Sequence, residues 1–281
     1  MGNEIPQEYN GEKVFKRHNS IQLRMGKILR RIPVFRTYNI NKGIKNIEAN
    51  TIIVFDNGRI LDKYVLQYIA ENNQGKRLIF YYWNPVSTAI SPDCVPKAFE
   101  VWSYSTEDCK KYGLKYNSTF YCGSYTHFSD TEIHTDVSFL GKDKGRREVL
   151  NRIREELKKS GLIVNYYITA THPRFQKKGY QHSLPYTESL KISLSSKAIL
   201  DYYMDPNAGL SLRPMEALFN DRKLITNNAT IKNYDFYHEN NILVIEDGDY
   251  SGVKAFLERP YAPINQDIKD YYLFENWVMR F

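Results

Sequence analysis

Short apolar runs alternate with segments of helical periodicity along most of this chain, and this alternation limits the possible fold more than any other feature. One example starts with an apolar run at 198–200, which ends at Asp201. After a turn-rich loop, Ser211 can cap a helix that keeps Pro214 in its first turn, and a second apolar run follows at 223–226. Strand, helix and strand in this order predict a parallel sheet, with a helix N-terminus at its carboxyl edge where a phosphate can bind.

The same alternation extends over both halves of the chain. In the first half, the pattern predicts strands at 51–55, 77–83, 99–103 and 118–122, a helix at 60–71 and another helix capped by Ser105 or Thr106. In the second half, it predicts strands at 137–140, 163–169 and 242–245, a helix that ends at Lys159 and another at 185–195. The fold class is therefore α/β, with two Rossmann-like domains facing a cleft.

A polar stretch of low periodicity at 123–135 is the expected linker between these domains. We therefore expect a basic helical segment at 1–50, a first domain at 51–128, a second domain at 129–264 and a terminal helix at 265–281. That last helix is rich in aromatic residues, which either cross back onto the first domain or pack into a single core.

Composition limits the cellular setting and the partners. The chain has 281 residues, 42% of them hydrophobic, and a formal charge of +7, which favours an anionic partner. No apolar run approaches the about 20 residues of a membrane-spanning helix, and the N-terminus lacks the apolar core of a signal peptide. We therefore expect a cytoplasmic or peripheral protein whose three cysteines, Cys94, Cys109 and Cys122, stay reduced.

The N-terminal segment combines basic charge with an apolar stripe at helical spacing. Its basic residues are Lys13, Lys16, Arg17, Arg24, Lys27, Arg30 and Arg31, and its apolar residues are Ile21, Met25, Ile28, Leu29 and Ile32. Such a helix can lie on an anionic membrane surface, or its stripe can pack on the first domain while the charges are solvated.

Basic residues also gather where the second domain begins. Gly141 follows the predicted strand at 137–140, Gly145 relaxes the turn, and Lys142, Lys144, Arg146 and Arg147 lie beside the start of the next helix. These side chains can neutralise a diphosphate, although a basic cluster on a helix is also a common solvated surface. The P-loop pattern of phosphate-binding proteins is absent.

The remaining polar motifs indicate little further chemistry. Asp56 and Asn84 follow predicted strands, Ser103 ends one, and Asp56 is the candidate catalytic residue. The triplet Asp247-Gly248-Asp249 matches a D-x-D metal motif, but we interpret it as a turn in which Asp249 caps a helix at 250–257. No histidine or cysteine cluster suggests a metal, so we expect neither a metal site nor a cofactor.

The stretch around Glu216 resembles the donor-binding half of two-Rossmann-domain (GT-B) glycosyltransferases. Gly209, Glu216-Ala217-Leu218 and Leu224-Ile225-Thr226 follow the order of that family's glycine loop, Glu-Ala helix and next strand. Ala208 and Asp221 differ from the residues usual there. The resemblance implies that Glu216 binds the nucleotide ribose, whereas the residues alone also allow a solvated first-turn charge.

The resemblance recurs at the basic turn, because the donor half of this family opens with a strand, a glycine, a basic residue and Lys-Gly before a helix. It implies that Gly141, Lys144, Arg146, Gly209, Ser211, Arg213 and Glu216 bind the donor nucleotide. It also implies a donor domain at 129–264, an acceptor-side domain at 51–128 and a terminal helix that crosses back.

The expected function is therefore a metal-independent glycosyltransferase. It would transfer a sugar, such as a hexose, from a nucleotide-sugar donor to a glycan or lipid-linked acceptor in bacterial cell-surface polysaccharide or lipopolysaccharide synthesis. A non-catalytic glycan-binding or partner subunit on the same fold is the alternative. Nucleic acid is not an expected partner. The sequence leaves open the donor sugar and nucleotide, the acceptor, inversion or retention, the catalytic base and the oligomeric state.

Overall fold

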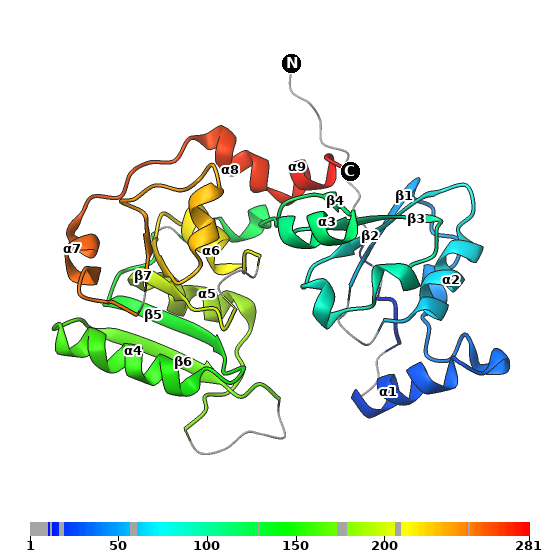
Figure 1. Ribbon diagram of the computed structural model, residues 1–281, viewed down its shortest axis with the longest axis horizontal. Coiled ribbons are helices and arrows are strands. Elements are labelled where there is room, and N and C mark those ends of the chain that lie inside the picture. Colours follow the sequence, from blue (N-terminus) through cyan, green and yellow to red (C-terminus); the bar gives the residue numbers. More distant parts are fainter. Residues whose placement is uncertain are drawn as a thin grey trace. The chain divides into compact units, whose positions relative to one another are not determined.

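The protein is an α/β molecule with two parallel sheets. The computed structural model describes residues 11, 13–16, 20–56, 61–126, 128, 130–172, 179–205, 209–246 and 248–281. It separates into two compact units, Met1–Ser118 and Thr119–Phe281. The first unit contains a four-stranded sheet and the second a five-stranded sheet (Figure 1). Two parallel-strand sheets with helices between the strands confirm the α/β fold class.

The first unit has the strand order β1-β2-β3-β4, with every neighbouring pair parallel. Its elements are α1 (Ser20–Leu29), β1 (Thr51–Phe55), α2 (Lys63–Asn72), β2 (Arg77–Tyr82), β3 (Phe99–Ser103), α3 (Thr106–Tyr112) and β4 (Lys115–Tyr116). Because the described strands follow one another in chain order, the sheet has no point at which the order reverses.

Capping residues fix where the helices of the first unit begin. The Asp62 carboxylate accepts hydrogen bonds from the backbone amides of Tyr64 and Val65 at 3.1 and 3.2 Å, so α2 begins at Lys63 rather than at position 60. Positions 57–60 lie outside the described residues. Ser105 is the cap of α3, since its hydroxyl accepts from the Asp108 amide at 3.2 Å.

The prediction of a strand at 118–122 is wrong, and the fourth strand is Lys115–Tyr116. The aromatic residues of that run pack in the second unit instead. The Phe120 ring lies 4.4 Å from that of Trp277, and Tyr121 stacks on Phe219 at 4.9 Å. An apolar run that fills a core of this kind has the same composition as a buried strand, which explains the error.

The second unit has the strand order β6-β5-β7-β8-β9, again with every neighbouring pair parallel. Its strands are β5 (Thr135–Lys142), β6 (Val164–Thr169), β7 (Ser196–Asp201), β8 (Lys223–Thr226) and β9 (Ile242–Val244). Its helices are α4 (Arg147–Lys159), α5 (Tyr186–Leu194), α6 (Arg213–Phe219), α7 (Val253–Glu258), α8 (Gln266–Tyr272) and α9 (Phe274–Val278). The chain runs outward from β5 to β6 and then crosses back to β7.

Each face of the second sheet has its own hydrophobic core. Successive residues of a strand point to opposite faces, so Ile199 of β7 packs with α5 and α6, while Ala198 and Leu200 pack with α4 and α7. In β8, Leu224 and Ile225 divide in the same way. Coverage of both faces explains why these strands are apolar without alternation.

The polar stretch 123–135 was the predicted linker between the domains. The division between the two units instead falls before it, between Ser118 and Thr119. Tyr125 and Phe128 pack against the core of the second unit. The carbonyl of Thr131 accepts a hydrogen bond from the buried Arg222 at 2.7 Å. This stretch is therefore part of the second unit.

The chain ends in two short helices instead of the single helix expected at 265–281. Leu273, between α8 and α9, has an extended backbone with φ −66° and ψ 141°. Its neighbours bond to Tyr121, whose amide donates to the Tyr272 carbonyl at 2.8 Å and whose carbonyl accepts from the Phe274 amide at 2.9 Å. This backbone pairing interrupts the helix.

The helix α1 lies within the N-terminal segment for which a helix was predicted. The stripe residues Ile21, Met25, Ile28 and Ile32 are exposed to solvent. No helix in the described part of the chain is long and apolar enough to cross a membrane.

Candidate anion-binding site

The strand order of the second unit defines where a ligand is expected. The order reverses between β5 and β7, and open α/β sheets bind ligands beyond the carboxyl ends of the strands at such a switch point. Three segments meet there: the turn after β5, the residues after β7 and the residues before α6. Together they bring Lys144, Arg146, Ser211 and Arg213 to one place, as the contacts below show.

The turn from β5 to α4 has an unusual backbone. Lys144 and Gly145 both have positive φ angles, 49° and 82°, and the Arg146 amide closes the turn on the Asp143 carbonyl at 3.0 Å. The Lys144 amide donates to the Thr171 hydroxyl at 2.7 Å. A left-handed conformation is unfavourable for lysine and is held by its surroundings, a situation common at binding sites.

Arg146 is a buried cation. Only 8% of its surface is exposed. Its Nη1 donates to the Tyr202 carbonyl and its Nη2 to the Lys142 carbonyl at 3.2 Å, while its buried Nε has no hydrogen-bond partner. Among the residues that the structure describes, no carboxylate forms an ion pair with it. Burial, followed by the charge of Arg213, lowers the pKa of Arg146 to about 10.

Arg213 reaches across the switch point from α6. Its Nη1 lies 3.1 Å from Asp201 Oδ1 at the end of β7, and its Nη2 donates to the Leu140 carbonyl of β5 at 2.6 Å. The guanidiniums of Arg213 and Arg146 both lie against the Phe139 ring, 5.0 and 4.9 Å from its centroid. The aromatic face thus supports two neighbouring cations.

The two guanidiniums pack against Gly141, which explains the glycine. A Cβ atom at this position would overlap Nη2 of Arg213 and would lie 3.6 Å from Nη2 of Arg146. The structure places Gly141 inside β5, paired with Ile168, rather than after the strand as predicted. Its role is to let the arginines approach the backbone.

Lys144 adds a third positive charge. Partial burial, followed by the charges of Arg146, Arg213 and Lys142, lowers its pKa. The nearby Asp143 is occupied, because Oδ1 accepts from the Arg147 amide at 2.8 Å and Oδ2 from the Tyr180 hydroxyl at 2.6 Å. Lys144, Arg146 and Arg213 thus lie close enough at the switch point to influence one another's charge.

Ser211 organises this site but does not cap α6 as predicted. The N-cap of α6 is Leu212. The Ser211 hydroxyl donates to Asp201 Oδ2 at 2.9 Å and accepts from the Arg213 amide at 3.2 Å. Its amide donates to the Tyr203 hydroxyl at 2.7 Å. Serine thus holds Asp201 in position to pair with Arg213.

Glu216 lies in the first turn of α6, as predicted, but it is not a solvated charge. Only 8% of its surface is exposed, and Oε1 accepts a hydrogen bond from the Tyr186 hydroxyl at 3.0 Å. Burial raises the pKa of Glu216, and the charge of Arg213 partly opposes this. A buried carboxylate that interacts electrostatically with Arg213 belongs to the same electrostatic system as the switch point.

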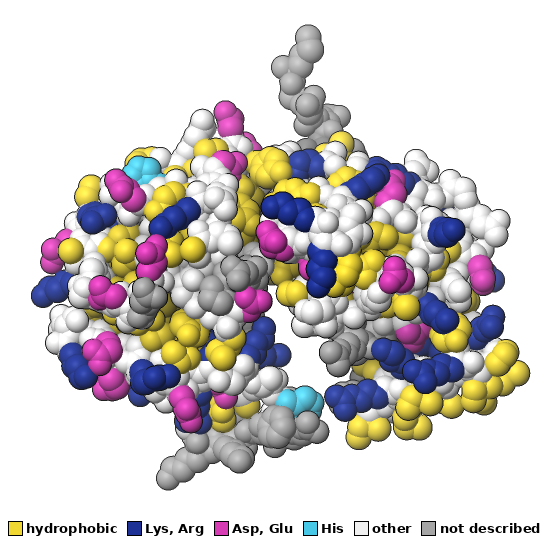
Figure 2. All heavy atoms as spheres, in the orientation of Figure 1, with side chains coloured by type: hydrophobic (Ala, Val, Ile, Leu, Met, Phe, Trp, Pro, Cys, Tyr) yellow, Lys and Arg dark blue, Asp and Glu magenta, His cyan; other side chains and the backbone are white. Residues whose placement is uncertain are grey.

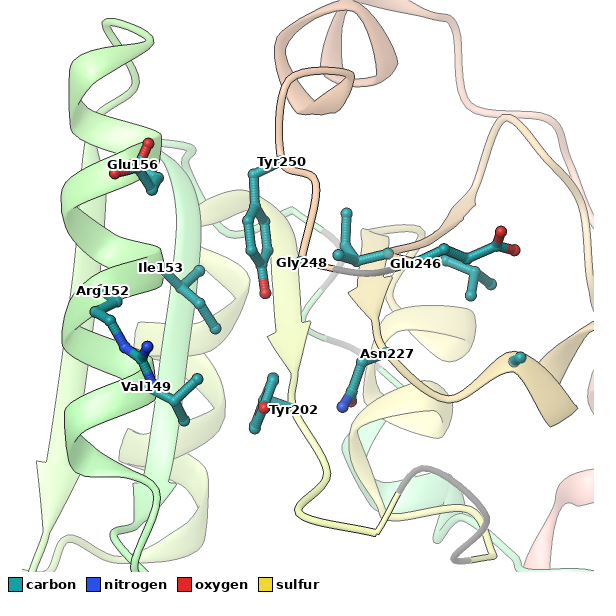
Figure 3. A pocket seen from close by; sticks show the side chains of 12 residues that line it. Val149, Arg152, Ile153, Glu156, Tyr202, Asn227, Glu246, Gly248 and Tyr250 are labelled. Carbon is teal, nitrogen blue, oxygen red and sulfur yellow. The ribbon is translucent and has the colours of Figure 1, made fainter.

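A pocket of ≈ 640 Å³ lies on the α4 face of the same sheet. Val149 and Ile153 of α4 form one wall, and Tyr202, Asn227 and Tyr250 come from the loops after β7, β8 and β9 (Figure 3). Tyr202 connects the pocket to the switch point, since its carbonyl accepts from Arg146. Burial, followed by the effect of Tyr202, raises the pKa of Tyr250 to about 12. This volume is in the range of small-molecule sites.

Two further predicted site residues are Asp56, in the first unit, and Gly209, in the second. Asp56 belongs to the first unit, where its carboxylate accepts from the Trp83 and Asn84 amides at 2.7 and 2.8 Å and holds the loop after β2. Gly209 precedes the buried Leu210 and follows 206–208, which lie outside the described residues.

The Asp-Gly-Asp triplet does not cap α7. Asp249 Oδ1 accepts from the Ser251 amide at 2.8 Å, and α7 begins only at Val253, with Gly252 as its N-cap. Asp247 lies outside the described residues. In the part of the chain that is described, no group of three or more His, Cys, Asp or Glu side chains could hold a metal ion.

Sequence reasoning missed three contributors to the site: Phe139, Asp201 and Tyr203. Asp201 carried a signal, because it directly follows an apolar strand at the predicted carboxyl edge. Phe139 has the apolar character of any buried strand residue. Its contact with two arginines arises only because β5 lies beside β7 in the sheet. The sequence matches no known protein-family model, and no curated protein is significantly similar to it.

Proposed function

We propose that this protein is a glycosyltransferase of the GT-B type, which binds a nucleotide-sugar donor in its second unit. The observation that carries the proposal is the buried Arg146, which forms no ion pair with a carboxylate of the described residues and interacts with the charges of Arg213 and Lys144 at the switch point of the five-stranded sheet. A buried cation without a counter-charge is unfavourable, and a bound anion relieves that cost. A diphosphate has the charge and the length to contact several of these side chains.

The chemistry of sugar transfer fits such a site. When the bond between the sugar and the nucleoside diphosphate breaks, negative charge develops on the diphosphate leaving group. Fixed cations stabilise this charge most effectively when they are already in place. Arg146 and Arg213 are held by backbone carbonyls and by the Phe139 ring before any ligand arrives. Positive side chains can thus perform the work of a metal ion.

Glu216 is the proposed contact of the nucleotide ribose. It lies three residues after Arg213 on α6 and interacts electrostatically with that arginine. A carboxylate can accept hydrogen bonds from both ribose hydroxyls. The pocket lined by Tyr202 and Tyr250 lies on the other face of the sheet, beside the core that contains α4. We assign the nucleoside to the Glu216 side.

The acceptor side of the proposal is assigned to the first unit, with Asp56 as the candidate catalytic residue. A glycan or a lipid-linked sugar in bacterial cell-surface polysaccharide synthesis is the proposed acceptor class. The proposal places this chemistry in the cytoplasm or on the inner face of the membrane, and it requires no additional cofactor.

The proposal is tested by incubating the protein with a panel of nucleotide sugars and measuring the release of nucleoside diphosphate. We expect release with at least one donor, equal rates with and without EDTA, and a loss of at least tenfold in kcat/KM for Arg213→Lys. Lys159→Gln, which removes an exposed charge at the far end of α4, is the matched control and keeps full activity. Activity that EDTA abolishes and Mn²⁺ restores would contradict the metal-independent mechanism.

A further inference from the structure

The orientation of α1 is the reverse of that expected for a surface helix. Arg30, the residue that directly follows α1, is 0% exposed and donates to Asp62 Oδ2 at 2.8 Å and to the Tyr38 carbonyl at 3.1 Å. Gly26 packs on the same side, where a Cβ would lie 3.3 Å from Asn39. The helix is thus fixed to the first unit by a buried ion pair and a close backbone approach.

The outward side of α1 is apolar. Ile21 is 66% exposed and Ile28 is 64% exposed. The spacing of the exposed residues over four, three and four positions places them on one side of the helix. The set also continues beyond the helix end. We call these residues the α1 patch: Ile21, Met25, Ile28, Ile32, Val34 and Phe35.

The charge around the α1 patch has one sign. From position 20 to position 47 the chain contains no Asp or Glu but seven basic residues. Arg30 is paired with Asp62, and the other six are Arg24, Lys27, Arg31, Arg36, Lys42 and Lys45. Figure 2 shows Lys and Arg side chains in a row beside the hydrophobic side chains in the region of α1, at the lower right.

We infer that the α1 patch docks on an anionic lipid surface. Apolar side chains enter the boundary between headgroups and acyl chains, while Lys and Arg beside them attract anionic headgroups, which is the combination that interfacial helices use. A second copy of this chain is a poorer occupant, because two such faces would bring positive charges together. The inference is independent of the proposed function, since it concerns α1 and not the switch point.

Co-sedimentation of the full chain with vesicles tests the inference. Vesicles of phosphatidylcholine alone are compared with vesicles of equal parts phosphatidylcholine and phosphatidylglycerol. We expect binding to the anionic vesicles, at least tenfold weaker binding to the neutral ones, and weaker binding at high salt. Absence of binding to anionic vesicles would overturn the inference.

Paired variants distinguish binding through the α1 patch from nonspecific binding through exposed apolar or basic side chains elsewhere. Ile21→Ser with Ile28→Ser should reduce vesicle affinity at least tenfold, and Arg24→Gln with Arg31→Gln should do the same. The apolar control is Ile163→Ser in the second unit, where the side chain is 61% exposed, and the charge control is Lys158→Gln with Lys159→Gln. Both controls should bind like the wild type. Equal losses in the controls, or full binding by the α1 variants, would overturn the inference.

Sedimentation velocity without vesicles decides whether the α1 patch instead joins two copies. The inference predicts the same monomeric sedimentation for the wild type and the Ile21→Ser, Ile28→Ser variant. A wild-type dimer that this variant dissociates would assign the patch to self-association. Nucleotide binding, measured in the same variant, should be unchanged, so that failure of this inference is distinguishable from failure of the proposed function.

Discussion

At the scale of single residues, two buried arginines of the second unit differ in their hydrogen bonds, and this difference assigns a structural role to one and a binding role to the other. Arg222 donates to the carbonyls of Leu194, Asn220 and Thr131, and it anchors the 123–135 stretch. Arg146 has two carbonyl partners, and its buried Nε has none. Lowering the arginine pKa from 12.5 to about 10 corresponds to a cost on the order of 3 kcal/mol for keeping Arg146 charged.

We therefore predict different effects when methionine replaces each arginine. Arg222→Met should lower the free energy of unfolding by about 2 to 4 kcal/mol, because it leaves buried carbonyls without donors. Arg146→Met should change it by less than about 1 kcal/mol, because the lost hydrogen bonds are offset by removal of an unpaired charge. Denaturant unfolding monitored by circular dichroism measures both. Equal destabilisation by the two variants would make Arg146 a structural arginine.

Glu216 provides a pH-dependent test at the same scale. Its pKa is raised in the folded state above the ordinary value of 4.5, so its contribution to stability is complete below 4.5 and is lost as the pH rises through the raised pKa. Glu216→Gln keeps an acceptor for the Tyr186 hydroxyl and should abolish this loss.

The same variant should also raise the donor KM or lower kcat/KM at least tenfold, about 1.4 kcal/mol, because an amide replaces only part of the carboxylate's hydrogen bonding. Melting curves across pH and steady-state kinetics check the two halves of the prediction. Lower stability with unchanged kinetics would assign Glu216 a structural role. Arg152→Gln, which alters the pocket on the other face of the sheet, is the matched kinetic control.

At the scale of elements, the strand and helix pattern was predictable where an element matches its local signals. The strands β1, β3 and β8 have the predicted limits, because each is a short apolar run bounded by turn residues. The strand expected at 118–122 and the single terminal helix were wrong, since Phe120, Tyr121 and Leu273 take their conformations from contacts with distant residues. The conformation of these segments depends on tertiary contacts, which a short stretch of sequence does not reveal.

The candidate site was likewise predictable only in part. Glycines, basic residues and the Glu-Ala pair were visible as local motifs. Their convergence was not visible, because it requires β5 to lie beside β7, with Asp201 paired to Arg213 and the Phe139 ring in contact with both arginines. Ser211 lies one residue before Leu212, the N-cap of α6, and its hydroxyl donates to Asp201 while it accepts from the Arg213 amide.

The close approach at the end of β5 gives an element-scale prediction. Gly141→Ala should displace the Arg213 side chain, since the added methyl group occupies its place, and should weaken nucleotide binding at least tenfold. Gly252→Ala is the control, because a Cβ there meets nothing within 4 Å. Thermal shift with and without a nucleoside diphosphate measures the effect. Identical ligand-induced shifts in the two variants would remove Gly141 from the site.

At the scale of the whole molecule, the second unit contains both of its own cores and every residue of the switch point. We predict that 119–281, produced alone, folds cooperatively and binds the same nucleotide within about threefold of the full chain's affinity. The unit should show no sugar transfer, because the proposed acceptor side is missing. Loss of nucleotide binding in a folded 119–281 would mean that the first unit supplies donor contacts.

The most direct test of the account is calorimetric titration of the full chain with nucleoside diphosphates in the presence of EDTA. We predict that at least one of them binds, that Arg146→Met weakens this binding at least tenfold, and that Lys159→Met leaves it unchanged. Binding that is equal in all three proteins, or no binding of any nucleoside diphosphate to the wild type, would contradict a donor site at the junction of β5 and β7.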